Sequence, residues 1–210
     1  EKLIFEHNEV DVSGLMYSRK RKVLTGVNYT VAKNEMIFFD TWREDLQQKL
    51  EEKLPGYEVV ISSFSKDETK AVVVTYSDKS RGTYYFYDVD KNKLAELGEV
   101  SPWLNEEDMS EMKPVKYRSR DGLVINGYLT LPKGTNGKNL PIVVNPHGGP
   151  WARDNWGYKS EIQFLANRGF AVFQMNFRGS TGYGREFWEK SFKEWGKSMQ
   201  DDISDGVKWL

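Results

Sequence analysis

The chain has 210 residues, which is enough for one large domain or two small ones. Its formal net charge is −1, so no excess of basic residues indicates binding to nucleic acid or to an anionic membrane. It contains no cysteine and only two histidines, so disulfides, cysteine nucleophiles, a metal site and a bound cofactor are not expected.

No apolar run of the sequence approaches the ~20 residues that span a bilayer. The N-terminal residues also lack the basic and apolar regions of a signal peptide. A signal that has already been removed would leave no trace, so the compartment stays open between cytoplasm and periplasm.

The first half of the chain is rich in short β-forming runs separated by polar turns. Five runs of Val, Ile, Phe, Tyr and Thr predict strands, at residues 23–31, 36–39, 58–64, 71–76 and 83–88. Leu46, Leu50 and Leu54 recur at helical spacing within residues 43–54, which predicts a helix that Pro55-Gly56 ends.

Meanders of about 40 residues are the unit of a β-propeller blade. The pattern therefore predicts one blade over residues 57–97 and part of another over residues 1–40. A plain antiparallel sheet fits the same pattern. Residues 101–113 are acidic and are expected to form a linker, which divides the chain into residues 1–113 and 114–210.

The second half of the chain has the pattern of an α/β domain. Two strand-like runs flank Arg120-Asp121-Gly122, a hairpin signal. Two apolar runs, at residues 142–144 and 170–175, predict strands that are buried on both faces. A helix between them would make the two strands parallel in a right-handed crossover.

Capping signals predict the ends of the helices in this half. Ser160 is expected to cap the crossover helix while Gln163 reaches back, and Gly169 is expected to end it. Ser198 is expected to cap the last helix, with acidic residues in its first turn. The apolar face of that last helix is predicted to consist of Met199, Ile203, Val207 and Leu210.

The sequence stops with this apolar face unfinished, so we expect the natural protein to continue beyond Leu210. A sheet edge left open at this point would favour pairing with another copy of the chain.

The strongest chemical signal is the loop Asn145-Pro146-His147-Gly148-Gly149-Pro150, which follows the predicted strand 142–144. In α/β-hydrolases, a His-Gly-Gly loop at this position supplies a main-chain N–H to the oxyanion hole. Such donors must be fixed before the reaction, and amides on a rigid loop meet that need. We therefore predict an oxyanion role for this loop, with a plain strand-to-helix turn as the alternative and a general-base role for His147 disfavoured.

The second signal is the glycine-rich segment 176–184, which follows the second parallel strand. Its GxxGxG spacing differs from the GxGxxG of a dinucleotide site. Loops at the carboxyl ends of parallel strands bind ligands, so Arg178, Gly179 and Tyr183 are candidates for a substrate loop. Arg178 is more readily explained as an anchor of the loop. Ser180 lacks the G-x-S-x-G elbow of a nucleophile.

No G-x-S-x-G motif occurs in the 210 residues, and His7 and His147 are the only histidines. A Ser-His-Asp site needs a base beside the serine and a carboxylate that orients the base. The sequence therefore offers no complete triad.

From Asp121 onward the chain resembles the acylaminoacyl-peptidase and dipeptidyl-peptidase branch of the prolyl oligopeptidase family of serine peptidases. Four blocks carry the resemblance: residues 120–132, His147-Gly148-Gly149-Pro150 with 151–156, residues 167–172, and residues 176–184 with Trp195-Gly196, Met199 and Asp201-Asp202. Residues 54–56 and the turns at 65–67 and Asp78 resemble the last propeller blades of that family more loosely.

The resemblance implies the end of a β-propeller followed by the start of an α/β-hydrolase domain, and a peptidase that hydrolyses short peptides by acyl transfer. The family's main-chain oxyanion donor falls on Gly149, next to Gly148, and a ring N–H of His147 is a second candidate donor. The family's catalytic Ser, Asp and His would lie beyond Leu210, so the chain alone is expected to be inactive. A carboxylesterase and a non-catalytic propeller module are the alternatives.

Overall fold

Residues 2–210, which the computed structural model describes, form three β-sheets. The first has the order β1-β2-β3, with strands Val12–Ser18, Val23–Thr30 and Asn34–Phe38. The second has the order β4-β5-β6-β7, with strands Glu58–Phe64, Lys70–Tyr76, Thr83–Asp88 and Lys93–Glu99. The third has the order β10-β11-β9-β8, with β8 Met112–Arg118, β9 Val124–Thr130, β10 Ile142–Val144 and β11 Ala171–Asn176.

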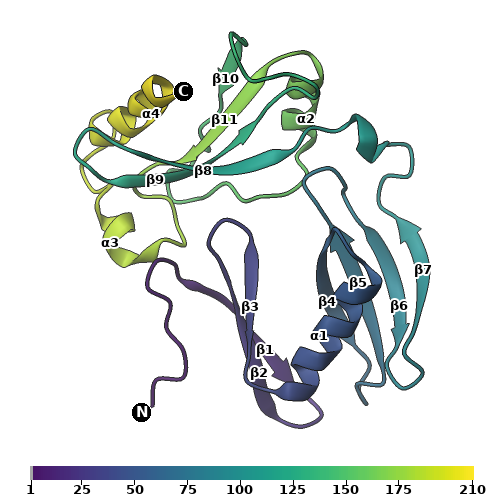
Figure 1. The fold of residues 1–210 in the computed structure, drawn as a ribbon. Helices are drawn as coiled ribbons and strands as arrows, with labels where there is room; N and C mark the ends of the chain where they lie inside the picture. The colour runs from purple at the N-terminus through teal and green to yellow at the C-terminus, as the bar shows by residue number, and fades with distance from the viewer. Residues whose placement is uncertain (1) are drawn as a thin grey trace.

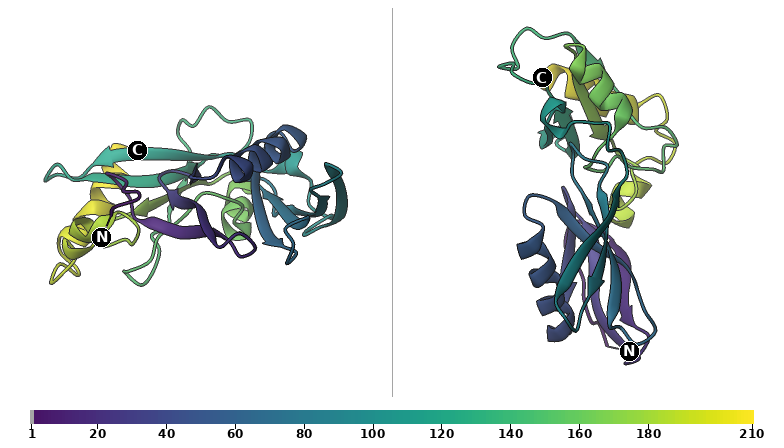
Figure 2. Two further views of the ribbon diagram at one scale, coloured as in Figure 1. Left: turned by 90° about the horizontal axis from the view of Figure 1, so that it is seen from below. Right: turned by 90° about the vertical axis from the view of Figure 1, so that its right-hand side faces the viewer.

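The helices are short and lie mostly in the second half of the chain. Their bounds are α1 Thr41–Lys53, α2 Ser160–Asn167, α3 Gly184–Glu189 and α4 Ser198–Trp209, with one 3-10 turn at Glu106–Asp108. The first two sheets and α1 form one lobe, and the third sheet with α2, α3 and α4 forms the other (Figure 1). The two further views show the same division, with the lobes stacked end to end (Figure 2).

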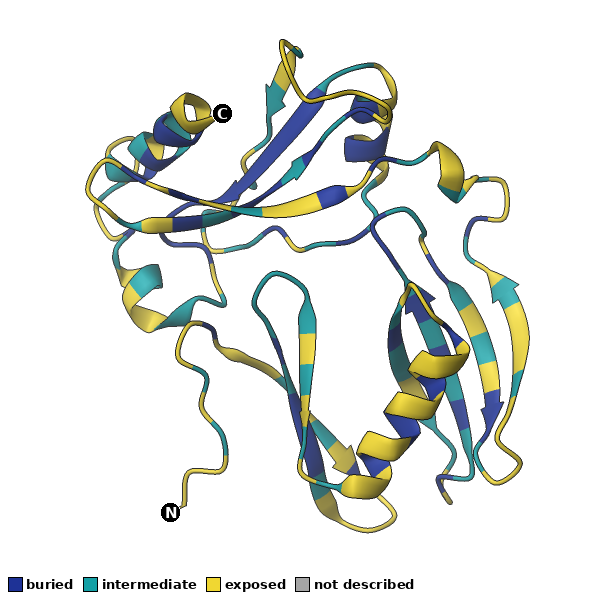
Figure 3. Cartoon of the chain, viewed as in Figure 1, coloured by how far each residue is buried: buried dark blue, intermediate teal, exposed yellow. Residues whose placement is uncertain are grey.

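The first lobe confirms the strands and the helix that the sequence predicts there. The two sheets are antiparallel meanders, as the strand-and-turn spacing indicates. Asp40 caps α1 by accepting a hydrogen bond from the Arg43 N–H. Leu46, Leu50 and Leu54 are buried against the β4–β7 sheet, while the opposite face of the helix is exposed (Figure 3).

The third sheet is mixed. β8 and β9 form the antiparallel hairpin predicted around residues 120–122, and β10 and β11 are parallel with α2 between them in sequence. Strand β11 is buried along its whole length because both faces of the sheet are covered. Phe173 and Met175 pack with residues of α4, whereas Val172 packs with Ile162 of α2.

Strand β10 differs from the prediction of a strand buried on both faces. It pairs only with β11 and forms an edge of the sheet, and Ile142 is 38% exposed. The apolar run marks the strand correctly, but its burial depends on neighbours that a local pattern does not reveal. Strand β8 starts at Met112, so the expected boundary at residues 113 and 114 falls inside a strand.

The predicted helix caps are wrong at Ser160 and Ser198 and right at Gly169. Helix α2 begins at Ser160 without a side-chain cap, and the Gln163 side chain instead donates to the carbonyls of Asp78 and Ser110. The Ser198 hydroxyl bonds to Glu194 and not to the helix it starts. Gly169 takes a left-handed φ of 88° after α2, as a helix-ending glycine does.

The inner face of α4 is more polar than predicted. Met199 is buried and Ile203 is partly buried, but Val207 and Leu210 are each 47% exposed. The buried positions are instead taken by Asp202, Asp205 and Gly206. The reason is that both carboxylates bind arginines of neighbouring turns: Asp202 binds Arg178, and Asp205 binds Arg120.

Candidate oxyanion site

The His147–Pro150 loop lies at the carboxyl end of β10, beside its parallel neighbour. The Asn145 N–H donates to the Phe173 carbonyl at 2.8 Å, which continues the β10–β11 pairing up to the start of the loop. Gly149 has a φ of 128°, a backbone conformation that side chains with a Cβ rarely adopt. A Cβ there would also lie 3.2 Å from the Trp151 nitrogen, so the turn requires glycine.

Gly148 and Gly149 are exposed at the tip of this loop. Among residues 2–210, no main-chain or side-chain acceptor takes a hydrogen bond from either amide. The loop borders a shallow hollow of about 350 Å³. The other walls of this hollow come from the turn after β11, from α4 and from the segment just before α4. The wall residues are Phe177, Trp195, Gly196, Met199, Gln200 and Ile203. Gly149 lines this hollow and Gly148 precedes it in the loop, and free main-chain N–H groups of this kind are able to stabilise a negatively charged oxygen.

The ring of His147 is held by contacts with neighbouring residues of the chain. Its Nε2 atom lies 2.8 Å from the Ser180 hydroxyl, and its Nδ1 atom lies 3.0 Å from the Gly148 carbonyl. The ring stacks on Phe177 with centroids 4.7 Å apart. Because both ring nitrogens already face polar partners, this arrangement favours a role for His147 in holding the loop.

Arg178 lies in the turn after β11 and is buried in an ion pair. Its Nη2 atom lies 2.7 Å from Asp202, which is fully buried in α4, and 2.8 Å from Asp121 of the β8–β9 hairpin. Its main-chain N–H also donates to Asp202 at 2.9 Å. Hydrogen bonds from the guanidinium to Asp202 raise the pKa of Arg178, so it stays charged. These contacts favour the anchoring interpretation over contact with substrate.

Gly179 allows this turn to pass close to the chain after α3. It has a φ of 93°, and an added Cβ would lie 2.4 Å from the Ser191 Cβ. The close packing of the turn therefore explains why residue 179 is a glycine, and Gly179 does not line the hollow beside Gly149.

Tyr183 has a partly buried hydroxyl that holds the segment after the His-Gly-Gly loop. Arg153 and Asn176 both lie within hydrogen-bond distance of this hydroxyl, at 2.9 and 2.8 Å. Burial raises the pKa of Tyr183 to about 12, so the hydroxyl is neutral at physiological pH. The structure thus brings Tyr183 to the loop at residues 151–156, and Tyr183 does not line the hollow beside Gly149.

Asn176 and Arg153 are positioning residues that the sequence did not single out. Asn176 is fully buried, and its side chain accepts from the Asp154 N–H and donates to the Asp154 carbonyl. Arg153 reaches across to the first lobe and donates to the carbonyls of Thr30 and Val31. The sequence signal that could have pointed to Asn176 is an asparagine at the end of an apolar strand. A side-chain amide buried there needs hydrogen-bond partners, and backbone groups can supply them.

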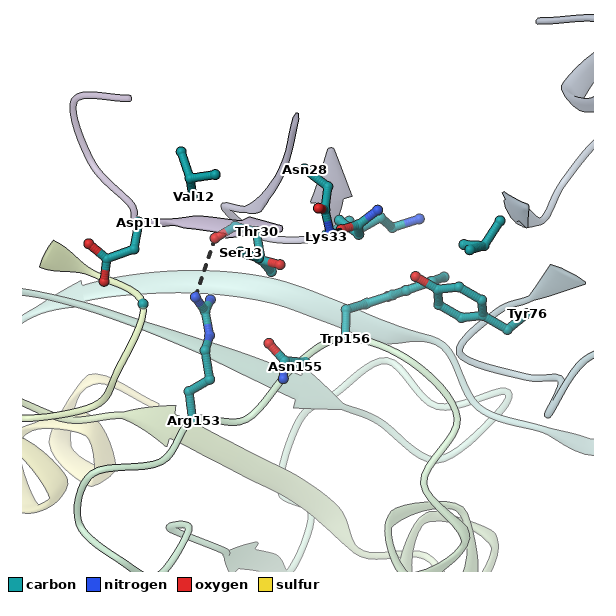
Figure 4. A pocket seen from close by; sticks show the side chains of 13 residues that line it. Asp11, Val12, Ser13, Asn28, Thr30, Lys33, Tyr76, Arg153, Asn155 and Trp156 are labelled. Carbon is teal, nitrogen blue, oxygen red and sulfur yellow. Dashed lines mark hydrogen bonds between the residues drawn. The ribbon is translucent and has the colours of Figure 1, made fainter. Parts of the chain in front are cut away.

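A second hollow, of about 590 Å³, lies between the lobes. Figure 4 shows Arg153, Asn155 and Trp156 on one side of it and Asp11, Thr30 and Lys33 on the other. The Lys33 ammonium lies 3.7 Å from the centre of a Trp156 ring, a cation–π contact between the lobes.

Two features of residues 2–210 bear on other kinds of site. No three His, Asp or Glu side chains come together as a metal site would require in this range. None of the helices described is both long and apolar enough to cross a membrane.

Comparison with known proteins identifies the family. Residues 156–210 match the prolyl oligopeptidase family. Over 215 aligned residues the chain is 35% identical to dipeptidyl aminopeptidase BIII of Pseudoxanthomonas mexicana, which covers 99% of this chain and 31% of that protein. The chain thus spans about a third of the length of the curated relatives it matches.

Two solved structures share the fold. One is a structure from a study of two prolyl endopeptidases, and it matches with a TM-score of 0.73 at 18% sequence identity. The match covers 99% of this chain and 30% of that chain. The second is the Pyrococcus horikoshii acylaminoacyl peptidase, with a TM-score of 0.63 at 19% identity over 96% of this chain and 31% of the other. The order of the sequence blocks, the loop at the end of β10 and these matches agree with one another, and over residues 156–210 the chain matches the prolyl oligopeptidase family.

Proposed function

We propose that this chain is part of a serine peptidase that hydrolyses short peptides by acyl transfer, and that the His147–Pro150 loop forms its oxyanion hole. The observation that carries the proposal is the pair of free amides, Gly148 and Gly149, at the carboxyl end of β10. A relative at 35% identity is named a dipeptidyl aminopeptidase, which favours removal of dipeptides over ester hydrolysis.

The domain division follows from the same proposal. Residues 1–113 would be the last blades of a β-propeller, and residues 114–210 would begin an α/β-hydrolase domain. The four-stranded meander β4–β7 has the strand count and order of a blade. The order β10-β11-β9-β8, with a parallel pair and an antiparallel hairpin, supports the hydrolase half.

The reaction needs a nucleophile, a base and an acid that these 210 residues do not supply as a triad. His147 is the one histidine near the site, and its ring contacts Ser180, which is fully buried. A buried hydroxyl is not available to a substrate carbonyl. We therefore infer that the serine, aspartate and histidine belong to further parts of a longer protein, and that this chain alone is inactive.

Labelling of the full-length protein by a fluorophosphonate probe tests this proposal. Such probes phosphorylate an activated serine, so we expect labelling of the native protein and none after denaturation. Mass spectrometry should place the label on a serine outside residues 1–210, and the native protein should turn over dipeptidyl or acylaminoacyl amide substrates.

A native full-length protein that stays unlabelled contradicts the proposal. So does a label found on Ser180 or on another serine of this chain. Turnover of p-nitrophenyl esters without any turnover of peptide amides would favour a carboxylesterase.

A further inference from the structure

The turn after β11 is bonded directly to the His-Gly-Gly loop through one buried hydroxyl. Ser180 is fully buried, and its Oγ atom lies 2.8 Å from the Nε2 atom of His147. The two residues are 33 positions apart in the chain, so this contact joins the ends of two neighbouring parallel strands.

The Ser180–His147 hydrogen bond is present whichever of the two groups donates the hydrogen. The Ser180 hydroxyl also lies 2.7 Å from the Phe177 carbonyl, which can only accept. If the hydroxyl donates to that carbonyl, Nε2 carries a hydrogen and donates to Oγ, and a neutral ring then makes no hydrogen bond to the Gly148 carbonyl. If the hydroxyl donates to Nε2, the Phe177 carbonyl keeps the Ser180 N–H at 3.0 Å as its donor. In both cases Nε2 is occupied by Ser180.

The turn that carries Ser180 is itself rigidly held. Arg178, two residues earlier, binds the buried Asp202 with its side chain and its main-chain N–H. Phe177 offers its ring face to the His147 ring at an interplanar angle of 18°. His147 is therefore fixed by a stacking contact and a hydrogen bond to a part of the protein that cannot move without breaking an ion pair.

We propose that Ser180 is a positioning residue of the oxyanion hole. By holding the His147 ring it fixes the backbone that leads into Gly148 and Gly149, whose amides have to be in place before charge develops on the substrate oxygen. This inference rests on the proposed function. In this inference His147 connects Ser180 to the Gly148–Gly149 backbone and does not itself donate a hydrogen bond to the substrate.

A double-mutant cycle in the full-length protein tests the proposal, with kcat and KM measured for one peptide amide substrate. Ser180→Ala removes the hydroxyl, and His147→Phe keeps a ring that can stack on Phe177. We expect each single variant to lower kcat by about 10- to 100-fold with little change in KM, since small misplacement of catalytic groups has effects of this size. The double variant should be no slower than His147→Phe alone, because both changes remove the same contact.

Ser18→Ala is the matched control for loss of a buried serine hydroxyl. Ser18 is 4% exposed and bonds to the Glu68 carboxylate in the first lobe, far along the chain from the loop. This variant should lose thermal stability as Ser180→Ala does, yet keep the wild-type kcat. The comparison separates loss of stability from loss of positioning.

Four outcomes would overturn the inference. A folded Ser180→Ala variant with the wild-type kcat contradicts it, as do additive effects in the double variant. If Ser180→Ala does not fold, a His147→Phe variant with unchanged kcat contradicts it by itself. A wild-type protein that does not react with a fluorophosphonate overturns the proposed function and the inference together, whereas the first three results overturn the inference alone.

Discussion

Arg178 shows how a charged residue near a candidate site can belong to the scaffold. A substrate-binding arginine keeps part of its guanidinium free, but here the group is shared between Asp202 and Asp121. Asp202 is fully buried, and a buried carboxylate is tolerated only when it is paired and hydrogen-bonded. The pair ties the turn after β11 to α4, which forms one wall of the hollow beside Gly149.

Replacement of Arg178 by Met should therefore lower stability strongly. The change leaves Asp202 buried without its partner, and removal of one member of a buried pair costs about 3–5 kcal/mol in free energy of unfolding. Equilibrium unfolding in urea, followed by tryptophan fluorescence, measures the loss.

Arg185→Met is the control for this prediction. The Arg185 side chain is 84% exposed and pairs with Glu189 one turn along α3, so its loss should change the free energy of unfolding very little. A variant Arg178→Met that is as stable as Arg185→Met but has a raised KM would indicate a substrate-binding role instead.

At the scale of single residues, the sequence identified the types of group at the site but not their contacts. The His-Gly-Gly motif located the loop because the need for glycine at a tight backbone turn is visible in the local sequence. The roles of Ser180, Asn176 and Asp202 depend on partners between 22 and 33 positions away in the chain. Local pattern carries no information on such pairings.

At the scale of elements, the β8–β9 hairpin and α4 are joined by a second set of charges. Asp205 of α4 accepts hydrogen bonds from the side chain and the main-chain N–H of Arg120, at 2.9 and 2.8 Å. These bonds hold the pKa of the Asp205 carboxyl well below its usual range. The polar inner face of α4, which helical periodicity alone did not predict, is explained by this pairing and by Asp202.

This pairing predicts a pH dependence of stability with a definite sign. Because the pKa of Asp205 is lower in the folded state, its contribution is present at neutral pH and is lost as the pH falls below about 4, the unfolded value. We expect Asp205→Asn to be less stable than wild type at pH 7, with a difference that shrinks between about pH 4 and the lower folded pKa. Unfolding midpoints measured from pH 7 to pH 2 test this.

Asp90→Asn provides the control, since Asp90 is exposed in the turn between β6 and β7. Its stability relative to wild type should stay nearly constant over the same range. A constant difference for Asp205→Asn as well would contradict the assigned ion pair.

Element types were predicted well where local sequence decides them. The Leu46, Leu50 and Leu54 spacing gave α1, and the hairpin signal gave β8 and β9, because these features depend on residues a few positions apart. Helix α3 was missed, since its six residues are too few to show a period. The predicted caps failed for different reasons: the Ser198 hydroxyl bonds to Glu194, whereas Ser160 is the first residue of α2 and makes no side-chain cap bond.

At the scale of the whole molecule, the two lobes are joined by contacts between groups far apart in sequence. Gln163 of α2 bonds to the carbonyls of Asp78 and Ser110, and Arg153 bonds to carbonyls at the end of β2. The Tyr128 hydroxyl donates to the Ala32 carbonyl at 2.7 Å. These bonds hold α2, β9 and, through Arg153, the loop that follows Pro150 against the first lobe.

A crystal structure of the full-length protein after reaction with a fluorophosphonate tests the central claim most directly. The phosphonyl oxygen of the adduct stands in for the charged oxygen of the tetrahedral intermediate. We expect this oxygen about 2.7–3.1 Å from the Gly149 amide nitrogen, as an oxyanion-hole donor requires. An adduct whose oxygen points away from residues 147–150, or a protein that forms no adduct, would contradict the account.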